Sequence, residues 1–326
     1  MTEQPPRYQP TDSSVSPRFT GVRTYARCPL SQDWDGADAA IIGVPFDTAT
    51  SFRPGARYGP AAIREMSLMM RRWHPVLEID IFNTLSVVDG GDVNTVPGNA
   101  ERTTALIAEQ LMPVIQAETV PVVLGGDHSI VLGELRAHAR RHGPLGLVLL
   151  DAHADTWDSY WGERYVHGTP FRRALDEGLI EPRRSLLAGM RGSLYAAADY
   201  EQPREWGFEI VSCEELRTWS PERYGERVRE RLSDGPAYLS FDIDVLDPAF
   251  APGTGTPEIS GLLSHEAQAF LRALAGIEFV GFDVVEVSPT YDGPGQVTAL
   301  QGATVAFEML ALTAIAKATR RGPRQA

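Results

Sequence analysis

The sequence is poor in cysteine and lysine, and these shortages narrow the class of protein. Its 326 residues include two cysteines, Cys28 and Cys213, which are far apart and form no CxxC pair. This excludes a disulfide framework or a cysteine-rich zinc site and favours a reducing, cytoplasmic location. Lys317 is the single lysine, and the 43 acidic residues outnumber the 30 basic ones. The resulting net charge of −13 argues against a nucleic-acid partner, which needs clustered basic side chains.

Long apolar runs are also missing. We find none that reaches the roughly 18–20 residues needed to cross a bilayer, so we expect no membrane partner. Residues 1–18 are rich in Pro, Ser, Gln and Thr and lack the apolar centre of a signal peptide. We therefore expect a flexible N-terminal leader over residues 1–18, followed by one domain over residues 19–326.

What the chain does have is an alternation of short apolar runs with helical patterns. This alternation predicts an α/β fold, a single-domain three-layer α/β/α architecture around a central parallel sheet of about eight strands. The expected strands are 39–46, 86–88, 121–124, 145–150, 185–189, 208–211, 237–241 and 279–287. The expected helices are 60–72, 100–117, 130–142, 170–178, 221–233, 264–275 and 297–318.

Three clusters of metal-ligand residue types each follow an expected strand. They are His128 in GGDHS, then Asp151, His153 and Asp155 in DAHAD, then Asp242 and Asp244 in DID. Alternate residues of an extended chain point to one side, and carboxyl ends of parallel strands meet at one sheet edge. Singly, such residues often cap helices or face solvent. Together they predict a site with two imidazoles and four carboxylates.

Four neighbouring carboxylates repel one another unless cations lie between them. Two divalent cations balance four negative charges. Because the ligands are mostly oxygen atoms with no thiolate, they favour two Mn²⁺ ions over a structural zinc.

These motifs resemble the ureohydrolases, the arginase/agmatinase family of binuclear manganese hydrolases. The resemblance extends over nearly the whole chain from about Pro17 and includes SFRPGARYGPAAIRE, SFDIDVLDPAFAPGTGTPE and GFDVVEVSPTYD. It implies an arginase-like fold, with residues 19–326 as the catalytic domain. It also implies that one Mn²⁺ takes His128, Asp151, Asp155 and Asp242, and that the other takes Asp151, His153, Asp242 and Asp244. By the same resemblance, His167 moves a proton and Glu286 holds the substrate guanidinium.

Without the resemblance, His167 and Glu286 have plainer interpretations. A histidine in a polar loop is usually solvated. A carboxylate in an apolar strand is costly unless it is paired, and a structural ion pair with an arginine is the ordinary solution. Asp127 and Asp247 flank the clusters and are candidates to orient the ligands. His138 and His142 share a helix with Arg140 and Arg141, where a solvated face is expected.

The family resemblance predicts a guanidino substrate that is cleaved to urea and a primary amine. The stretch 162–166 lacks the Ser-Gly-Asn element of arginases, so the chain is most similar to agmatinases, guanidinobutyrases and proclavaminate amidinohydrolases. Agmatine, which yields putrescine, is the favoured substrate, and a guanidino acid (4-guanidinobutyrate, 3-guanidinopropionate or a proclavaminate-type compound) is the alternative. Candidate tail-binding residues are Asp158 and Glu163 for an ammonium, and Arg164, Arg191 and Tyr195 for a carboxylate.

Two other classes compete with a binuclear hydrolase. One is a non-catalytic metal-binding pseudoenzyme, against which the complete set of ligand residues argues. The other is a related deacetylase with one zinc, against which His128 and Asp244 argue. The family also assembles as trimers or hexamers, so we expect a homo-oligomer in which residues 19–29 contact a neighbouring subunit.

Overall fold

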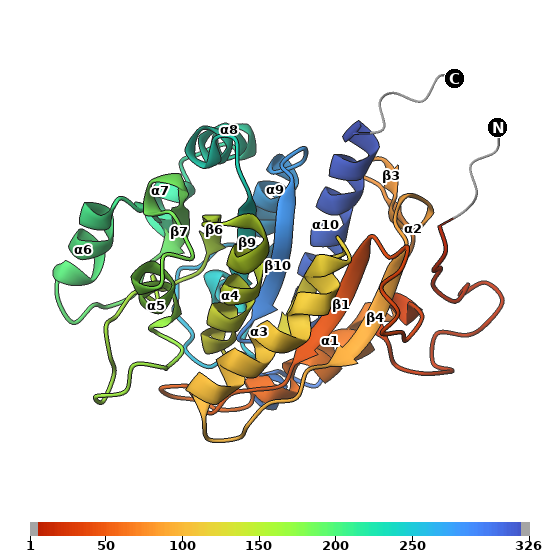
Figure 1. Cartoon of the computed structure of the whole chain (residues 1–326), viewed down its shortest axis with the longest axis horizontal. Coiled ribbons are helices and arrows are strands. Elements are labelled where there is room, and N and C mark those ends of the chain that lie inside the picture. The colour runs from red at the N-terminus through yellow and green to blue at the C-terminus, as the bar shows by residue number, and fades with distance from the viewer. Residues whose placement is uncertain (1–5, 321–326) are drawn as a thin grey trace.

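A computed structural model describes residues 6–320 and shows eight parallel strands in one sheet, with helices on both faces (Figure 1). The strand order is β4-β1-β5-β10-β9-β6-β7-β8. The strands are β1 (Ala39–Val44), β4 (Val87–Asp92), β5 (Val120–Gly125), β6 (Gly146–Leu150), β7 (Leu186–Met190), β8 (Glu209–Ser212), β9 (Ala237–Asp242) and β10 (Phe279–Val285). The predicted three-layer α/β/α fold is confirmed.

The helices follow the predicted order, with three additions. They are α1 (Gly59–Ser67), α2 (Ile81–Thr84), α3 (Ala100–Gln116), α4 (Val131–His142), α5 (Pro170–Asp176), α6 (Ala198–Trp206), α7 (Cys213–Leu216), α8 (Pro221–Leu232), α9 (Ser264–Ala273) and α10 (Val297–Arg320). Helices α2, α6 and α7 were not predicted, and α1 ends before the predicted limit at residue 72. A small antiparallel ribbon, β2 (Trp73–His74) with β3 (Ile79–Asp80), occupies the residues after α1.

Alternate side chains of each strand enter two different cores. Val148 and Leu150 of β6 belong to the core beneath α8, α9 and α10, whereas Leu147 and Leu149 belong to the core beneath α4 and α5. Both faces are covered, so the central strands are largely apolar, as is typical of parallel sheets. The apolar runs in the sequence are therefore explained by the two layers of helices, which bury both faces of these strands.

Helix α10 corrects one expectation. By length and composition it could cross a membrane, with a mean hydropathy of 1.5 over its most apolar window. Within that window, 78 % of the residues are buried inside the molecule, as in the core helix of a globular domain. Its buried Glu308 forms ion pairs with His74 and Arg272. The sequence interpretation missed this apolar stretch because occasional polar residues interrupt it.

The N-terminal segment contacts the domain without forming a helix or strand over residues 6–18. Arg7 forms ion pairs with Asp33 and Asp35, and the backbone N–H of Tyr8 donates to Ser86 Oγ at 2.9 Å. The first five residues of the predicted leader lie outside the described residues. The flexible leader over 1–18 stays a prediction.

Candidate metal and guanidinium site

The register of four central strands brings the three predicted clusters to one place. Leu124 of β5, Val284 of β10, Phe241 of β9 and Leu150 of β6 are paired in one row across the sheet. The next residues along β9 and β6 are Asp242 and Asp151, which therefore lie on neighbouring strands. The chain order places β9 and β10 between the two halves of the sheet, where open α/β sheets bind ligands.

Six side chains converge at this edge, and we refer to them as the floor: His128, Asp151, His153, Asp155, Asp242 and Asp244. His128 Nδ1 lies 3.1 Å from Asp151 Oδ2, 3.1 Å from Asp155 Oδ2 and 3.2 Å from Asp242 Oδ2. His153 Nδ1 lies 3.1 Å from Asp244 Oδ2 and 3.6 Å from Asp151 Oδ1. The geometry thus forms two ligand groups that share Asp151, and it brings together the six residues selected from the sequence.

Burial shifts the acidity of the floor carboxylates. Asp151 is fully buried, and this burial, together with the charges of Asp244 and Asp155, raises its pKa to about 7. Burial and the charges of Asp244 and Asp151 also raise the pKa of Asp242 well above its usual value. Burial alone would raise the pKa of Asp244, but the charge and hydrogen bond of His153 outweigh it and hold that pKa below its usual range.

A buried ion pair elsewhere in the sheet shows what the floor lacks. Asp89 of β4 is also fully buried, and Arg64 Nε donates to it at 2.8 Å. Among the described residues, none of the four floor carboxylates has an arginine or lysine partner in an ion pair. The two histidines can carry at most two positive charges against four carboxylates, so the remaining negative charge suits a cationic ligand.

Hydrogen bonds behind His128 fix which ring nitrogen faces the carboxylates. Ser240 Oγ donates to Asp283 Oδ1 at 2.7 Å, and it lies 2.9 Å from His128 Nε2. Since its single proton goes to Asp283, Ser240 accepts from Nε2–H, and a neutral His128 presents its Nδ1 lone pair to the floor. His128 Nδ1 and Asp151 Oδ2 are buried without a hydrogen-bond partner in the described structure. Lone pairs facing one another in this way fit divalent cations.

The predicted pair His167 and Glu286 lies directly beside the floor. His167 Nδ1 is 2.9 Å from Glu286 Oε1, which also accepts from the backbone N–H of His128 at 2.8 Å. Glu286 Oε2 is buried and has no hydrogen-bond partner among the described residues. The alternative of a structural ion pair with arginine is therefore wrong for Glu286. The alternative of a solvated loop is wrong for His167, which is only 9 % exposed.

The charge of Glu286 also controls His167. Burial alone lowers the pKa of His167, but the charge and hydrogen bond of Glu286 outweigh it and raise this pKa to about 9. On the other side of the ring, the backbone N and Oγ of Ser51 lie 3.0 and 2.7 Å from Nε2. The imidazole is therefore held between a carboxylate and a hydroxyl, which are partners that suit proton transfer.

Two residues of the site adopt strained backbone conformations. Asp155 has a φ of 50° and Glu286 has a φ of 62°, both in the left-handed region. Such positions cost on the order of 1–3 kcal/mol for side chains other than glycine and occur preferentially at functional sites. The fold maintains this strain where the two carboxylates are aimed at the same small volume.

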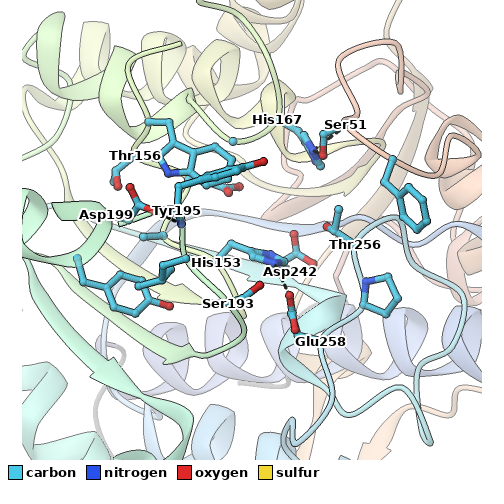
Figure 2. A pocket seen from close by; sticks show the side chains of 18 of the residues that line it. Ser51, His153, Thr156, His167, Ser193, Tyr195, Asp199, Asp242, Thr256 and Glu258 are labelled. Carbon is cyan, nitrogen blue, oxygen red and sulfur yellow. Dashed lines mark hydrogen bonds and ion pairs between the residues drawn. The ribbon is translucent and has the colours of Figure 1, made fainter. Parts of the chain in front are cut away.

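A cavity of about 550 Å³ opens above the floor (Figure 2). His153, Asp155, Asp242 and His167 line its inner end. The outer wall comes from four loops and the start of α6, and it is formed by Phe52, Arg53, Trp157, Leu194, Tyr195, Asp199, Tyr200 and Glu258. In Figure 2, Tyr195 and Asp199 lie across the cavity from Ser51 and Thr256. The floor and this outer wall are thus distinct parts of one pocket.

Of the tail-binding candidates chosen from the sequence, only Tyr195 lines this cavity. The Arg191 guanidinium donates to backbone carbonyls, including those of Asp244 at 2.6 Å and Glu258 at 2.8 Å. Arg164 pairs with Asp176, and Asp158 pairs with Arg173. Glu163 is exposed and lies outside the cavity lining. The sequence shows the charges of these candidate residues, but it does not show the groups with which they form hydrogen bonds and ion pairs in the fold.

The structure adds residues that sequence inspection missed. Ser51 contacts His167, Ser240 and Asp283 orient His128, and Glu258 Oε1 approaches His153 Nε2 at 3.9 Å. One signal was available for Ser240, because it precedes Asp242 by two positions on a strand and so shares its face. Asp283 was also conspicuous as a carboxylate within an apolar strand.

Other predictions about neighbouring residues had mixed outcomes. Asp127 caps the turn that carries His128 by accepting from the backbone N–H of Ser129 at 3.1 Å, so it orients the ligand through the main chain. Asp247 instead accepts from the backbone N–H groups of Ala249 and Gly261. The solvated face expected for His138 is wrong, because the ring is 1 % exposed and packs against Tyr238.

The sequence pattern of the Arginase family matches residues 37–311, and the chain belongs to this family. Its sequence is 46 % identical over 301 residues to the mitochondrial agmatinase of Gallus gallus, covering 92 % of this chain and 88 % of that protein. It is 45 % identical over 307 residues to the guanidinopropionase of Pseudomonas aeruginosa, covering 94 % and 96 % of the two chains. The predicted ureohydrolase class, an enzyme acting on linear amidines, is confirmed.

The fold is shared with solved structures of the family. The proclavaminate amidino hydrolase from Streptomyces clavuligerus superimposes with a TM-score of 0.87 at 40 % identity, covering 92 % of this chain and all of that one. The arginase from Bacillus subtilis superimposes with a TM-score of 0.72 at 28 % identity, covering 83 % and 98 % of the two chains. The names of these relatives refer to different substrates. The comparisons therefore do not identify the substrate of this chain, and the residues of its pocket have to be considered.

Proposed function

We propose that this chain is a binuclear manganese hydrolase that cleaves agmatine to urea and putrescine. The observation that carries the proposal is Glu286 Oε2, a buried carboxylate oxygen that has no hydrogen-bond partner within residues 6–320 and lies beside a floor of four further carboxylates. A guanidinium is a planar cation with several N–H donors, and it suits such an oxygen. Membership of the Arginase family supports hydrolysis of a guanidino group.

Two Mn²⁺ ions fit the floor. In this proposal His128, Asp151, Asp155 and Asp242 hold one ion, and Asp151, His153, Asp242 and Asp244 hold the other. The oxygen-rich ligand set and the partnerless atoms His128 Nδ1 and Asp151 Oδ2 support this assignment. When bound, such a pair of ions lowers the pKa of water towards 7 and so supplies hydroxide near neutral pH.

The residues around the floor then have separate tasks. Glu286 Oε2 holds the guanidinium and so fixes the position of its carbon, which removes part of the orientational barrier. Asp155 accepts a hydrogen bond from the attacking nucleophile. His167, held between Glu286 and Ser51, gives a proton to the departing amine.

The outer wall supports agmatine as the substrate. Asp199 and Glu258 line it and favour an ammonium tail. A guanidino acid is the second candidate because Arg53 also lines the cavity, and among the described residues it forms no ion pair. Relatives named guanidinopropionase and guanidinobutyrase support this second candidate.

We also propose a cytoplasmic homo-oligomer, a trimer or a hexamer. Phe19 is 76 % exposed and Val22 is 69 % exposed within the stretch 19–29 that we expect to contact a neighbouring subunit. Large exposed apolar side chains that lie close together often mark an interface. Mass determination by light scattering tests the assembly, and a monomeric mass would contradict it.

The test of the function is a substrate panel with Mn²⁺-loaded protein. Agmatine, 4-guanidinobutyrate, 3-guanidinopropionate and arginine are compared by urea release, and bound metal is counted per chain. We expect two manganese ions and the highest kcat/KM on agmatine. Absence of urea from every compound would leave a pseudoenzyme, and a single zinc per chain would favour a deacetylase-like centre. A preference for an acid would replace the substrate while leaving the floor chemistry in place.

A further inference from the structure

An aromatic cluster stands at the mouth of the cavity. The ring of Trp157 stacks on Tyr160, with centroids 5.3 Å apart and planes 10° apart. The ring of Tyr195 tilts against the same indole at 5.5 Å, and its hydroxyl is hydrogen-bonded to that of Tyr160 at 2.5 Å. Three rings from two different loops therefore hold one another in place.

The local chain fixes the indole close to the reacting end of the pocket. The backbone N–H of Trp157 donates to the carbonyl of Gly168 at 3.1 Å. A Cβ added to Gly168 would lie 2.9 Å from the indole, so the residue next to His167 must be small for the ring to be seated there. Trp157 and Tyr195 both line the cavity, whereas Tyr160 supports them from behind.

The charges around these rings are asymmetric. Asp199 lines the same wall, and its Oδ2 accepts from the backbone N–H of Tyr195 at 2.9 Å. The single arginine of the lining, Arg53, lies on the Ser51 side of the cavity, with its guanidinium 5.2 Å from the ring centroids of both Phe52 and Tyr291. Ring faces attract cations, and a neighbouring carboxylate adds to that attraction.

We propose that Trp157, Tyr195 and Asp199 form the subsite for the end of the substrate remote from the guanidinium, and that this subsite selects a cationic tail. The inference rests on the proposed guanidino hydrolase activity and assigns its specificity to named residues. A carboxylate tail at the same place would meet the negative faces of the rings and the charge of Asp199. An acid could gain an ion pair only by turning towards Arg53.

Three substrates of equal chain length separate these possibilities. Agmatine ends in an ammonium, 4-guanidinobutyrate ends in a carboxylate, and butylguanidine ends in a methyl group. We expect Trp157→Leu to lower kcat/KM for agmatine about tenfold, and Asp199→Asn about fivefold, mostly through KM. Both variants should leave butylguanidine within about twofold, because its tail has no charge to bind. Trp157→Phe keeps a ring face and should restore part of the agmatine rate.

Arg164→Gln, outside the cavity lining, is the control and should leave all three substrates within about twofold. Arg53→Gln on the opposite wall should impair 4-guanidinobutyrate more than agmatine, if that acid reacts at all. Equal losses on all three substrates in Trp157→Leu and Asp199→Asn would overturn the proposal, because they would indicate a structural role. A wild-type preference for 4-guanidinobutyrate that disappears in Arg53→Gln would also overturn it.

Product binding separates this subsite from the catalytic proposal. Calorimetry with 1,4-diaminobutane and 4-aminobutyrate, the amine products of the two candidate substrates, needs no turnover. We expect the diamine to bind more tightly, with the preference reduced about tenfold in Trp157→Leu. Tighter binding of 4-aminobutyrate would overturn the subsite even if urea is released. Absence of urea from every guanidino compound would instead refute the hydrolase function, whatever the amines do.

Discussion

The floor and the outer wall of the pocket are formed by different kinds of structural element. The floor residues follow buried parallel strands whose register places Asp151 beside Asp242. The outer wall comes from loops and the start of α6, and Tyr195 at its rim is 73 % exposed. The positions of the floor residues are determined by the buried core, whereas those of the wall depend on contacts between loops, such as the Tyr160–Tyr195 hydrogen bond. Chemistry and substrate choice are thus separable in this fold.

The comparison predicts that a floor substitution abolishes the reaction on every substrate. Asp242→Asn keeps the shape of the side chain but removes one of the four charges that require cations. We expect kcat/KM to fall by about 10³-fold or more on agmatine and on guanidino acids alike. Steady-state urea release and manganese content by mass spectrometry measure the two consequences.

The control for this variant is Asp234→Asn, an exposed carboxylate far from the floor in the loop before β9. It should retain wild-type activity and metal content. If Asp242→Asn retained two tightly bound manganese ions and most of its activity, Asp242 would not be a shared ligand, and the floor would need reassignment.

Glu286→Gln tests the boundary between floor and wall. The amide can still accept from the backbone N–H of His128, but it cannot offer a charged oxygen to a guanidinium. We expect kcat/KM to fall about 100-fold, with two manganese ions retained. Loss of metal together with activity would contradict the assigned role and make Glu286 a support of the floor instead.

The sequence predicted the residues of the floor much better than those of the outer wall. Short apolar runs that alternate with helical patterns predicted each strand of the sheet, and the period of two within DAHAD and DID predicted which side chains converge. The resemblance supplied the roles of His167 and Glu286, which residue type alone left ambiguous. Buried strands allow few alternative registers, so the hydrophobic pattern of the sequence is sufficient to predict how the floor residues are placed.

The wall was not predictable in the same way. Arg191 and Arg164 carry the charge that a carboxylate tail needs, yet backbone carbonyls and Asp176 already occupy them. Trp157 and Tyr195 meet only because two loops fold over the same cavity. Side-chain partners across loops depend on tertiary placement, which neither propensity nor spacing encodes.

Removal of the metal tests the proposed metal site by its effect on thermal stability rather than on the rate of hydrolysis. At 100 times the dissociation constant, each bound ion stabilises the fold by about 2.7 kcal/mol, so chelation of two ions should lower Tm by about 8 °C. The pKa of Asp151, raised to about 7 by burial and by neighbouring carboxylates, contributes to the pH dependence of the metal-free protein. Between its ordinary pKa of about 4 and about 7, the folded state binds more protons than the unfolded state, so metal-free stability falls as pH rises.

Added Mn²⁺ should therefore raise Tm more at pH 8 than at pH 5.5, because ligands must be deprotonated to bind it. Thermal scans with chelator and with Mn²⁺ at both pH values measure this difference. A metal-free Tm that rises between pH 5.5 and 8 would contradict the assignment of uncompensated buried carboxylates.

Arg191→Lys tests the connection between floor and wall. The guanidinium donates to carbonyls on both sides, at Asp244 and at Glu258, and an ammonium lacks the geometry to reach them together. We expect a loss of about fivefold in kcat/KM that is equal for agmatine and 4-guanidinobutyrate. A loss confined to 4-guanidinobutyrate would instead return Arg191 to the role of a tail ligand.

Arg164→Gln should have the smallest effect. Its side chain is 57 % exposed and pairs with Asp176 at 3.1 Å, outside the cavity lining. Exposed ion pairs of this kind contribute at most about 1 kcal/mol, so we expect less than about twofold change in kcat/KM on either substrate. Arg53→Gln serves as the comparison, since Arg53 lines the cavity and should affect the guanidino acid more than agmatine. If Arg164→Gln selectively impaired 4-guanidinobutyrate, the loop that carries it would have to close over the substrate, and the wall would then be formed during binding rather than before it.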